Sequence, residues 1–142
     1  MPVLSFAVAT QEHFDAIVQI ERRAGGGSVV ALTGGRALQE ALDRGHWVIV
    51  ALDGGSVVGW AWFSVELDRG GEHTGQIFRI VVEAAARRAG VATALLEHAR
   101  TVFAGREVVR VRAVLDGADA EARAFFEAAG YAPASVTMER PL

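Results

Sequence analysis

The strongest constraint on the fold of this chain lies near its centre, where an apolar run passes through a turn into a helical pattern. Residues 76–82 are Gln-Ile-Phe-Arg-Ile-Val-Val, a run rich in β-branched residues, which favours a buried strand. From Ala92 onward apolar residues recur at three- and four-residue steps, which predicts a helix. Arg87 and Gly90 stand between the two. We therefore expect a strand, a short turn and a helix at the centre of the fold.

The turn has the chemistry of an anion-binding site. The first backbone N–H groups of a helix have no partner within the helix, and the helix dipole adds positive character there. Arg87 and Arg88 add full charges, and Gly90 leaves its backbone uncovered by a side chain. These features suit phosphate oxygens. The alternative is an ordinary strand-to-helix turn with two solvated arginines.

The pattern Arg87-x-x-Gly90-x-Ala92 resembles the signature of the GNAT family of N-acetyltransferases. That signature is Arg/Gln-x-x-Gly-x-Gly/Ala after a central strand. In the family this loop wraps the pyrophosphate of acetyl-coenzyme A, so the resemblance implies acetyl-coenzyme A as co-substrate.

A second stretch, residues 119–131, also resembles the family. It keeps Ala122, Glu127 and Gly130 of the family pattern and closes it with the aromatic Tyr131. Two motifs with a strand between them are more specific than either alone. With the hairpin described below, the resemblance covers nearly the whole chain.

Periodicity and resemblance together predict a mixed α/β chain with the GNAT fold. The resemblance implies a central, mostly antiparallel sheet with flanking helices, in which the strands at 76–82 and 108–115 splay apart. Glu21 is expected to close the first helix together with the arginines after it. We expect strands at 5–9, 47–52, 57–65, 76–82, 108–115 and 131–140, and helices at 10–23, 33–44, 92–103 and 118–129, in a single domain over 1–142.

A hairpin is predicted where Asp53-Gly54-Gly55-Ser56 separates two apolar runs. Trp60 and Trp62 share one face of the returning strand. We expect both in the core; the alternative is that they form a wall of the substrate site.

The resemblance also implies where the cofactor binds. In the family, pantetheine enters between the two splayed strands like an added strand, and the backbone of the first of them, here the strand at 76–82, bonds to it. Carried over onto this sequence, the cofactor-binding residues are Ile80, Val81, Val82, Arg87, Arg88, Ala89, Gly90, Val91, Ala92, Thr93, Asp119 and Phe126.

Three positions depart from the family pattern at the expected catalytic site. Phe126 replaces a frequent tyrosine that protonates the leaving thiolate, and phenylalanine donates no proton. Gln76 stands near the position of a frequent carboxylate base; it can order a water but takes no proton at neutral pH. Asp119 replaces an asparagine beside the cofactor and is a poor neighbour for phosphate.

Other proton acceptors are sparse. The polar segment 66–74 is expected to be solvated surface; the alternative is that it recognises a cationic acceptor, with Glu72 or His73 taking a proton. Glu83 and Asp116 stand at strand ends as further candidates without independent support.

The function that the resemblance implies is acetyl transfer to a primary amine of a small molecule or peptide by direct attack. Placement of the reactants can supply roughly 7–11 kcal/mol of the barrier, so weak acid-base assistance is tolerated. The alternative, favoured by Phe126 and Gln76, is a non-catalytic acyl-coenzyme A binding or sensing module. The sequence does not name the acceptor.

Composition excludes several other classes. The 142 residues include no cysteine, which removes disulfides, thiolate catalysis and cysteine-ligated metal, and no metal is expected. A net charge of −3 with scattered arginines argues against nucleic acid. No long apolar run or secretory pattern points to a membrane. We expect a bacterial, cytoplasmic protein, and homodimerisation stays open.

Overall fold

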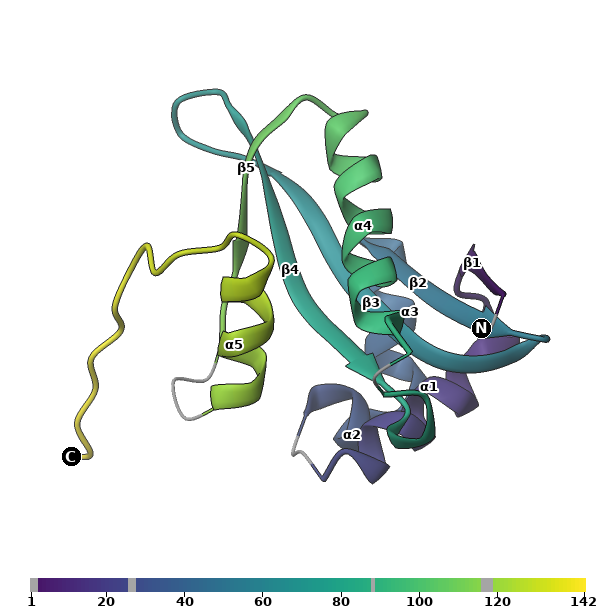
Figure 1. Cartoon of the computed structure of the whole chain (residues 1–142). Helices are drawn as coiled ribbons and strands as arrows, with labels where there is room; N and C mark the ends of the chain where they lie inside the picture. The colour runs from purple at the N-terminus through teal and green to yellow at the C-terminus, as the bar shows by residue number, and fades with distance from the viewer. Residues whose placement is uncertain (1–2, 26–27, 88, 116–118) are drawn as a thin grey trace.

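The computed structural model describes residues 3–25, 28–87, 89–115 and 119–142. The strands form one sheet in the order β1-β2-β3-β4-β5, antiparallel from β1 to β4 and parallel between β4 and β5 (Figure 1). This arrangement confirms the predicted mixed α/β class and the mostly antiparallel sheet. The elements are β1 (Leu4–Val8), α1 (Gln11–Arg23), α2 (Val29–Thr33), α3 (Gly35–Asp43), β2 (Trp47–Asp53), β3 (Ser56–Leu67), β4 (His73–Val82), the short 3-10 helix η1 (Ala84–Ala86), α4 (Val91–Ala104), β5 (Val108–Ala113) and α5 (Ala120–Ala128).

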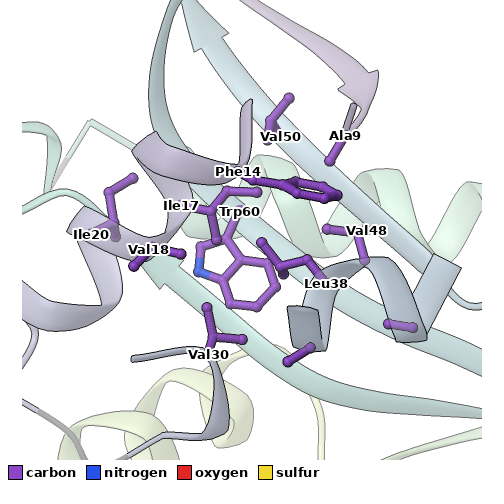
Figure 2. Close-up of a cluster of buried hydrophobic side chains, with 12 residues drawn as sticks. Ala9, Phe14, Ile17, Val18, Ile20, Val30, Leu38, Val48, Val50 and Trp60 are labelled. Atoms are coloured by element: carbon purple, nitrogen blue, oxygen red, sulfur yellow. The ribbon is translucent and has the colours of Figure 1, made fainter. Parts of the chain in front are cut away.

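Helices cover both faces of the sheet. One core cluster joins α1, α2 and α3 to β2 and β3, and a second joins α4 and α5 to β2, β3 and β4. The two clusters explain why four consecutive residues of β2, 48–51, are all almost fully buried. Trp60 is the largest buried side chain and lies at the centre of the first cluster (Figure 2). Its predicted place in the core is confirmed.

The predicted hairpin is also confirmed. β2 ends at Asp53 and β3 begins at Ser56, so the turn is Gly54-Gly55. Both glycines have positive φ angles, +58° and +87°. Residues that carry a Cβ adopt such angles only with strain.

The predicted helix at 33–44 is wrong at its start. Gly34, with φ +65° and ψ −145°, separates two helices there, α2 and α3. α2 was not expected. The Ser28 hydroxyl caps its start, accepting a hydrogen bond from the Ala31 N–H at 3.1 Å.

The predicted strand at 131–140 is absent. These residues form no helix or strand and run away from the sheet beyond α5 (Figure 1). Val136 and Met138, which alternate as in a strand, are 84% and 90% exposed. An alternating pattern forms a strand only where a neighbouring strand satisfies its backbone, and no strand lies beside this segment among the described residues.

Candidate functional site

The candidate site is centred on a gap between β4 and β5. The two strands pair only from His73 to Ile77 on β4 and from Val108 to Ala113 on β5. Beyond Ile77, β4 continues as residues 78–82 and pairs with β3 alone. Within the described part of the chain, the other backbone edge of residues 78–82 has no strand beside it. The predicted splay is therefore present, and it leaves peptide groups able to pair with an extended ligand.

A bulge lies at the start of the gap. Ile77 pairs with Phe63 and Arg79 pairs with Trp62, so Phe78 has no partner residue on β3. The bulge directs both Phe78 and Arg79 to the α1–α3 side, where Phe78 packs against Trp62 and Arg79 bonds to Glu21. The sequence contains no sign of this bulge.

The end of β4 leads through η1 and the exposed Arg87 into α4. Gly90 is the N-cap of α4, with a left-handed φ of +77°, and no side chain caps the helix. Nothing described lies within 4 Å of where a Gly90 side chain would stand. No described side chain caps the opening N–H groups of α4, and such groups suit an anion. Arg88 lies outside the described residues.

Gly59 holds this helix start against the sheet. A Cβ at Gly59 would lie 3.1 Å from both the Val81 carbonyl oxygen and Val91 Cγ1. Glycine thus allows the first turn of α4 to contact β3 next to β4. Because Val91 is buried, that residue can offer a ligand only its backbone.

Two residues expected at the cofactor have structural partners. Phe126 is 7% exposed and packs edge-to-face on Phe125 and Tyr131, with ring centroids 5.1 Å apart in each pair. Asp119 caps α5, its Oδ1 accepting from the Ala122 N–H at 3.0 Å. Their predicted contacts with a cofactor stay predictions.

Tyr131 lies away from the gap between β4 and β5. It lines a groove of about 790 Å³ between α4, β5 and α5, to which β4 contributes no residue. Burial raises the pKa of the Tyr131 hydroxyl, an effect that the Arg100 charge opposes and the Glu97 charge reinforces. A second hollow of about 550 Å³ lies beneath η1 and the start of α4. Neither hollow includes the strand edge at residues 78–82.

The predicted proton acceptors are not gathered at the gap. Gln76 lies two residues before Phe78, on the α1–α3 side opposite Ser64. His73 is the first residue of β4 and lies five residues before Phe78, roughly 16 Å at the spacing of a strand. Its Nδ1 is 3.1 Å from the Arg106 carbonyl oxygen. Glu72 precedes it. Glu83 is ion-paired with Arg23 at 3.0 Å, and Asp116 lies outside the described residues.

Sequence reasoning missed the buried carboxylate of Glu21. It is 0% exposed and accepts hydrogen bonds from Arg79 Nε at 3.1 Å and Nη2 at 2.7 Å. It also accepts from Trp60 Nε1 at 3.1 Å and from the Ser28 hydroxyl at 2.9 Å. One signal could have revealed it: Glu21 follows Ile17 by four residues, on the apolar face of α1.

A second group lies beside the bulge. We call His46, Trp62 and Phe78 the ring cluster. Trp62 Nε1 donates to His46 Nδ1 at 3.0 Å, and the His46 ring stacks on Phe78 with centroids 5.4 Å apart. Burial lowers the pKa of His46, while the charge of Glu66 raises it and that of Arg44 lowers it. The accepted bond requires His46 Nδ1 to be unprotonated.

We expect His46 to make the protein less stable in acid. Its folded pKa lies below the unfolded value of about 6.5. Stability from neutral His46 is therefore fully present above about pH 6.5 and is lost as pH falls through the lowered folded pKa. Urea unfolding at pH 7.5 and pH 5 should show a smaller loss for His46→Asn, which keeps an acceptor but does not titrate. An equal loss in both proteins would contradict this role.

Comparison with known proteins agrees with this geometry. A family model described as "Acetyltransferase (GNAT) family" matches residues 12–131. A transcriptional regulator from Bacillus halodurans C-125 superimposes with a TM-score of 0.82 at 19% identity, over 99% of this chain and 100% of the other. An acetyltransferase from Trypanosoma brucei gives 0.77 at 19% identity, over 99% and 100%.

A third solved structure is an aminoglycoside acetyltransferase from an uncultured soil metagenomic sample, in complex with sisomicin. It gives a TM-score of 0.79 at 16% identity, over 98% of this chain and 96% of the other. At such identities these likenesses show the fold alone. No curated protein sequence matches the chain.

Proposed function

This chain belongs to the acetyltransferase (GNAT) family, and from that premise we propose that it transfers the acetyl group of acetyl-coenzyme A to a primary amine of a small molecule or peptide. The observation that carries the proposal is that β4, with an unpaired edge at residues 78–82, is followed along the chain by η1 and by the start of α4 at Gly90. An extended thioester with a diphosphate at its far end matches both the edge and the helix start.

The chain's own groups suit that ligand. The N–H groups opening α4 and the exposed Arg87 are donors for pyrophosphate oxygens. The backbone of Ile80, Val81 and Val82 lies on the unpaired edge and can bond to pantetheine amides. Ala89, Ala92 and Thr93 complete the proposed loop, and Arg88 belongs to it by sequence.

The chemistry requires little of the side chains. The thioester supplies the acetyl group, and a backbone N–H of β4 can stabilise the oxyanion that forms on attack. Gln76 is an uncharged polar side chain two residues before the bulge and can hold a water to receive the amine proton. Phe126 donates no proton to the leaving sulfur. The sulfur can leave as a thiolate, because the pKa of such a thiol is near 8.5.

A second candidate is a non-catalytic acyl-coenzyme A binding module. It is favoured by Phe126, which is embedded among aromatic rings where the family has a proton donor, and by Gln76. Release of free coenzyme A in the presence of amines separates the two candidates. Binding of acetyl-coenzyme A without release for any amine would favour the module.

Reversing the charge at Arg87 should weaken acetyl-coenzyme A binding. A charge-assisted contact is worth about 1.5–3 kcal/mol, so Arg87→Glu should raise Kd by about tenfold or more and flatten its salt dependence. Isothermal titration calorimetry at two salt concentrations measures both. Arg140→Glu, in the exposed C-terminal segment, is the matched control and should change neither. Unchanged affinity in Arg87→Glu would remove the loop from the proposal.

A further inference from the structure

The ring cluster stands beside the gap, on the sheet face away from α4. Its outer member, Phe78, is the first β4 residue beyond the last pair with β5. Phe78 is 40% exposed although its ring already contacts two others. A molecule that approaches the gap from this face therefore passes an open aromatic surface.

That surface is held rigidly. The ring centroids of Trp62 and Phe78 are 5.0 Å apart, and His46 stacks almost parallel to Phe78 at an interplanar angle of 13°. The hydrogen bond between Trp62 and His46 fixes the two supporting rings to each other. A ligand ring that packs on Phe78 would meet a surface already ordered, so binding loses little conformational entropy there.

The charge beside the cluster is negative. Glu66 lies on the same face of β3 as Trp62 and Ser64, and the Ser64 hydroxyl donates to Glu66 Oε1 at 2.8 Å. Among the described residues Glu66 forms no ion pair, and it is close enough to act on the charge of His46.

Of the four arginines near this face, Arg44, Arg79, Arg110 and Arg112, two have carboxylate partners. Arg79 is bound by Glu21, and Arg110 lies 4.0 Å from Asp68. Arg112 of β5 is exposed. It pairs with Gln76 of β4, which in turn pairs with Ser64 of β3. Arg44 acts on His46 with the opposite sign to Glu66. The exposed Glu66 still offers an ammonium group a carboxylate partner beside the cluster.

We propose that the ring cluster and Glu66 form the acceptor site, and that the acceptor is a primary amine carrying an aromatic ring. The inference rests on the proposed acetyl transfer. The ring of the acceptor packs on Phe78, its amine reaches the gap, and Glu66 draws the cationic form to this face. His46 and Trp62 act as positioning residues because they hold Phe78.

The test compares 2-phenylethylamine with n-hexylamine in a coenzyme A release assay. Both are primary amines with similar apolar bulk, and only the first has a ring. Aromatic pairs are worth about 0.5–1.5 kcal/mol, so kcat/KM should favour the aromatic amine by about twofold to twelvefold. Phe78→Leu keeps apolar bulk and should abolish the preference. Val109→Ala, at an exposed position on β5 in the groove between α4 and α5, should keep it.

Glu66→Gln should lower kcat/KM for both amines and reduce its salt dependence. Unchanged acetyl-coenzyme A affinity in Phe78→Leu, measured by calorimetry, would show that the variant is folded and loaded normally. Equal rates for the two amines in the wild-type protein would overturn the acceptor class while leaving acetyl transfer intact.

Failure of the proposed function has a different signature, namely binding of acetyl-coenzyme A without release of coenzyme A for any amine. The acceptor surface is then tested by binding alone. 2-Phenylethylamine should shift the indole N–H resonance of Trp62 in the loaded protein, and n-hexylamine should shift it less. The absence of any shift would reject the site.

Discussion

Replacing Glu21 with alanine should lower the free energy of unfolding by about 2–3 kcal/mol: an unsatisfied buried donor costs about 1–3 kcal/mol, and the charge left on Arg79 is partly solvated, since its side chain is 37% exposed. The substitution would leave Arg79 without its bidentate partner and the Trp60 N–H buried without an acceptor. Urea unfolding at pH 7 gives the difference. A loss below about 1 kcal/mol would mean that the carboxylate contributes no more than a surface pair.

The chain offers a matched control for this measurement. Glu40 is also a helical glutamate paired with an arginine, Arg36, at 3.2 Å, but both side chains are largely exposed. Glu40→Ala should cost at most about 1 kcal/mol. A double variant, Glu21→Leu with Arg79→Met, removes both charges and should recover part of the stability lost in Glu21→Ala.

Replacing Glu21 should also affect the candidate site. Arg79 immediately follows the bulge at Phe78, and Glu21 ties it to α1 and, through Ser28, to the cap of α2. We infer that Glu21 helps to hold β4 in the bulged conformation at the gap. The Glu21→Leu, Arg79→Met pair tests this without an unpaired charge: its kcat should fall more than its affinity for acetyl-coenzyme A.

Substituting valine for Gly90 should weaken acetyl-coenzyme A binding by about 100-fold or more. The left-handed backbone at Gly90 costs a β-branched residue about 1–2 kcal/mol. The side chain would also stand beside the open N–H groups of α4 and exclude the pyrophosphate from several hydrogen bonds, each worth about 1.5–3 kcal/mol when charged. Calorimetry measures the affinity, and urea unfolding measures the strain.

Gly71→Val separates the two effects. Gly71 has a φ of +82°, close to that of Gly90, and it too has open space where its side chain would stand. It lies in the loop between β3 and β4, at the other end of β4 from Gly90. Both variants should lose similar stability, and only Gly90→Val should lose affinity. Wild-type affinity in Gly90→Val would contradict the proposed pyrophosphate site.

Much of the fold could be predicted because its signals are local. The turn at Gly54-Gly55 depends on the backbone freedom of two adjacent residues, and the helix after Gly90 depends on spacing within one segment. The predicted positions of β2, β3 and β4 followed from apolar runs between such turns. Each of these features is decided within a few residues, so a pattern in the sequence is sufficient to find it.

Where the prediction was wrong, the hydrogen-bond partners available to the backbone were decisive. Residues 131–140 have the alternation of a strand but no strand beside them. The predicted helix from Thr33 ignored the capping hydroxyl of Ser28, which itself donates to Glu21. In both cases the hydrogen-bond partners available to the backbone outweighed the local propensity.

By itself, the sequence determined the order of the five strands and of α1, α4 and α5, and the chemistry of the Arg87-to-Ala92 turn, because propensity, turn geometry and charge belong to neighbouring residues. Only the tertiary structure decided where β4 and β5 separate, since that depends on which backbone groups of two distant strands still meet. It also decided the bulge at Phe78 and the burial of Glu21. A buried charge is stable only where its partners converge from separate elements, and here they come from β3, β4 and the start of α2.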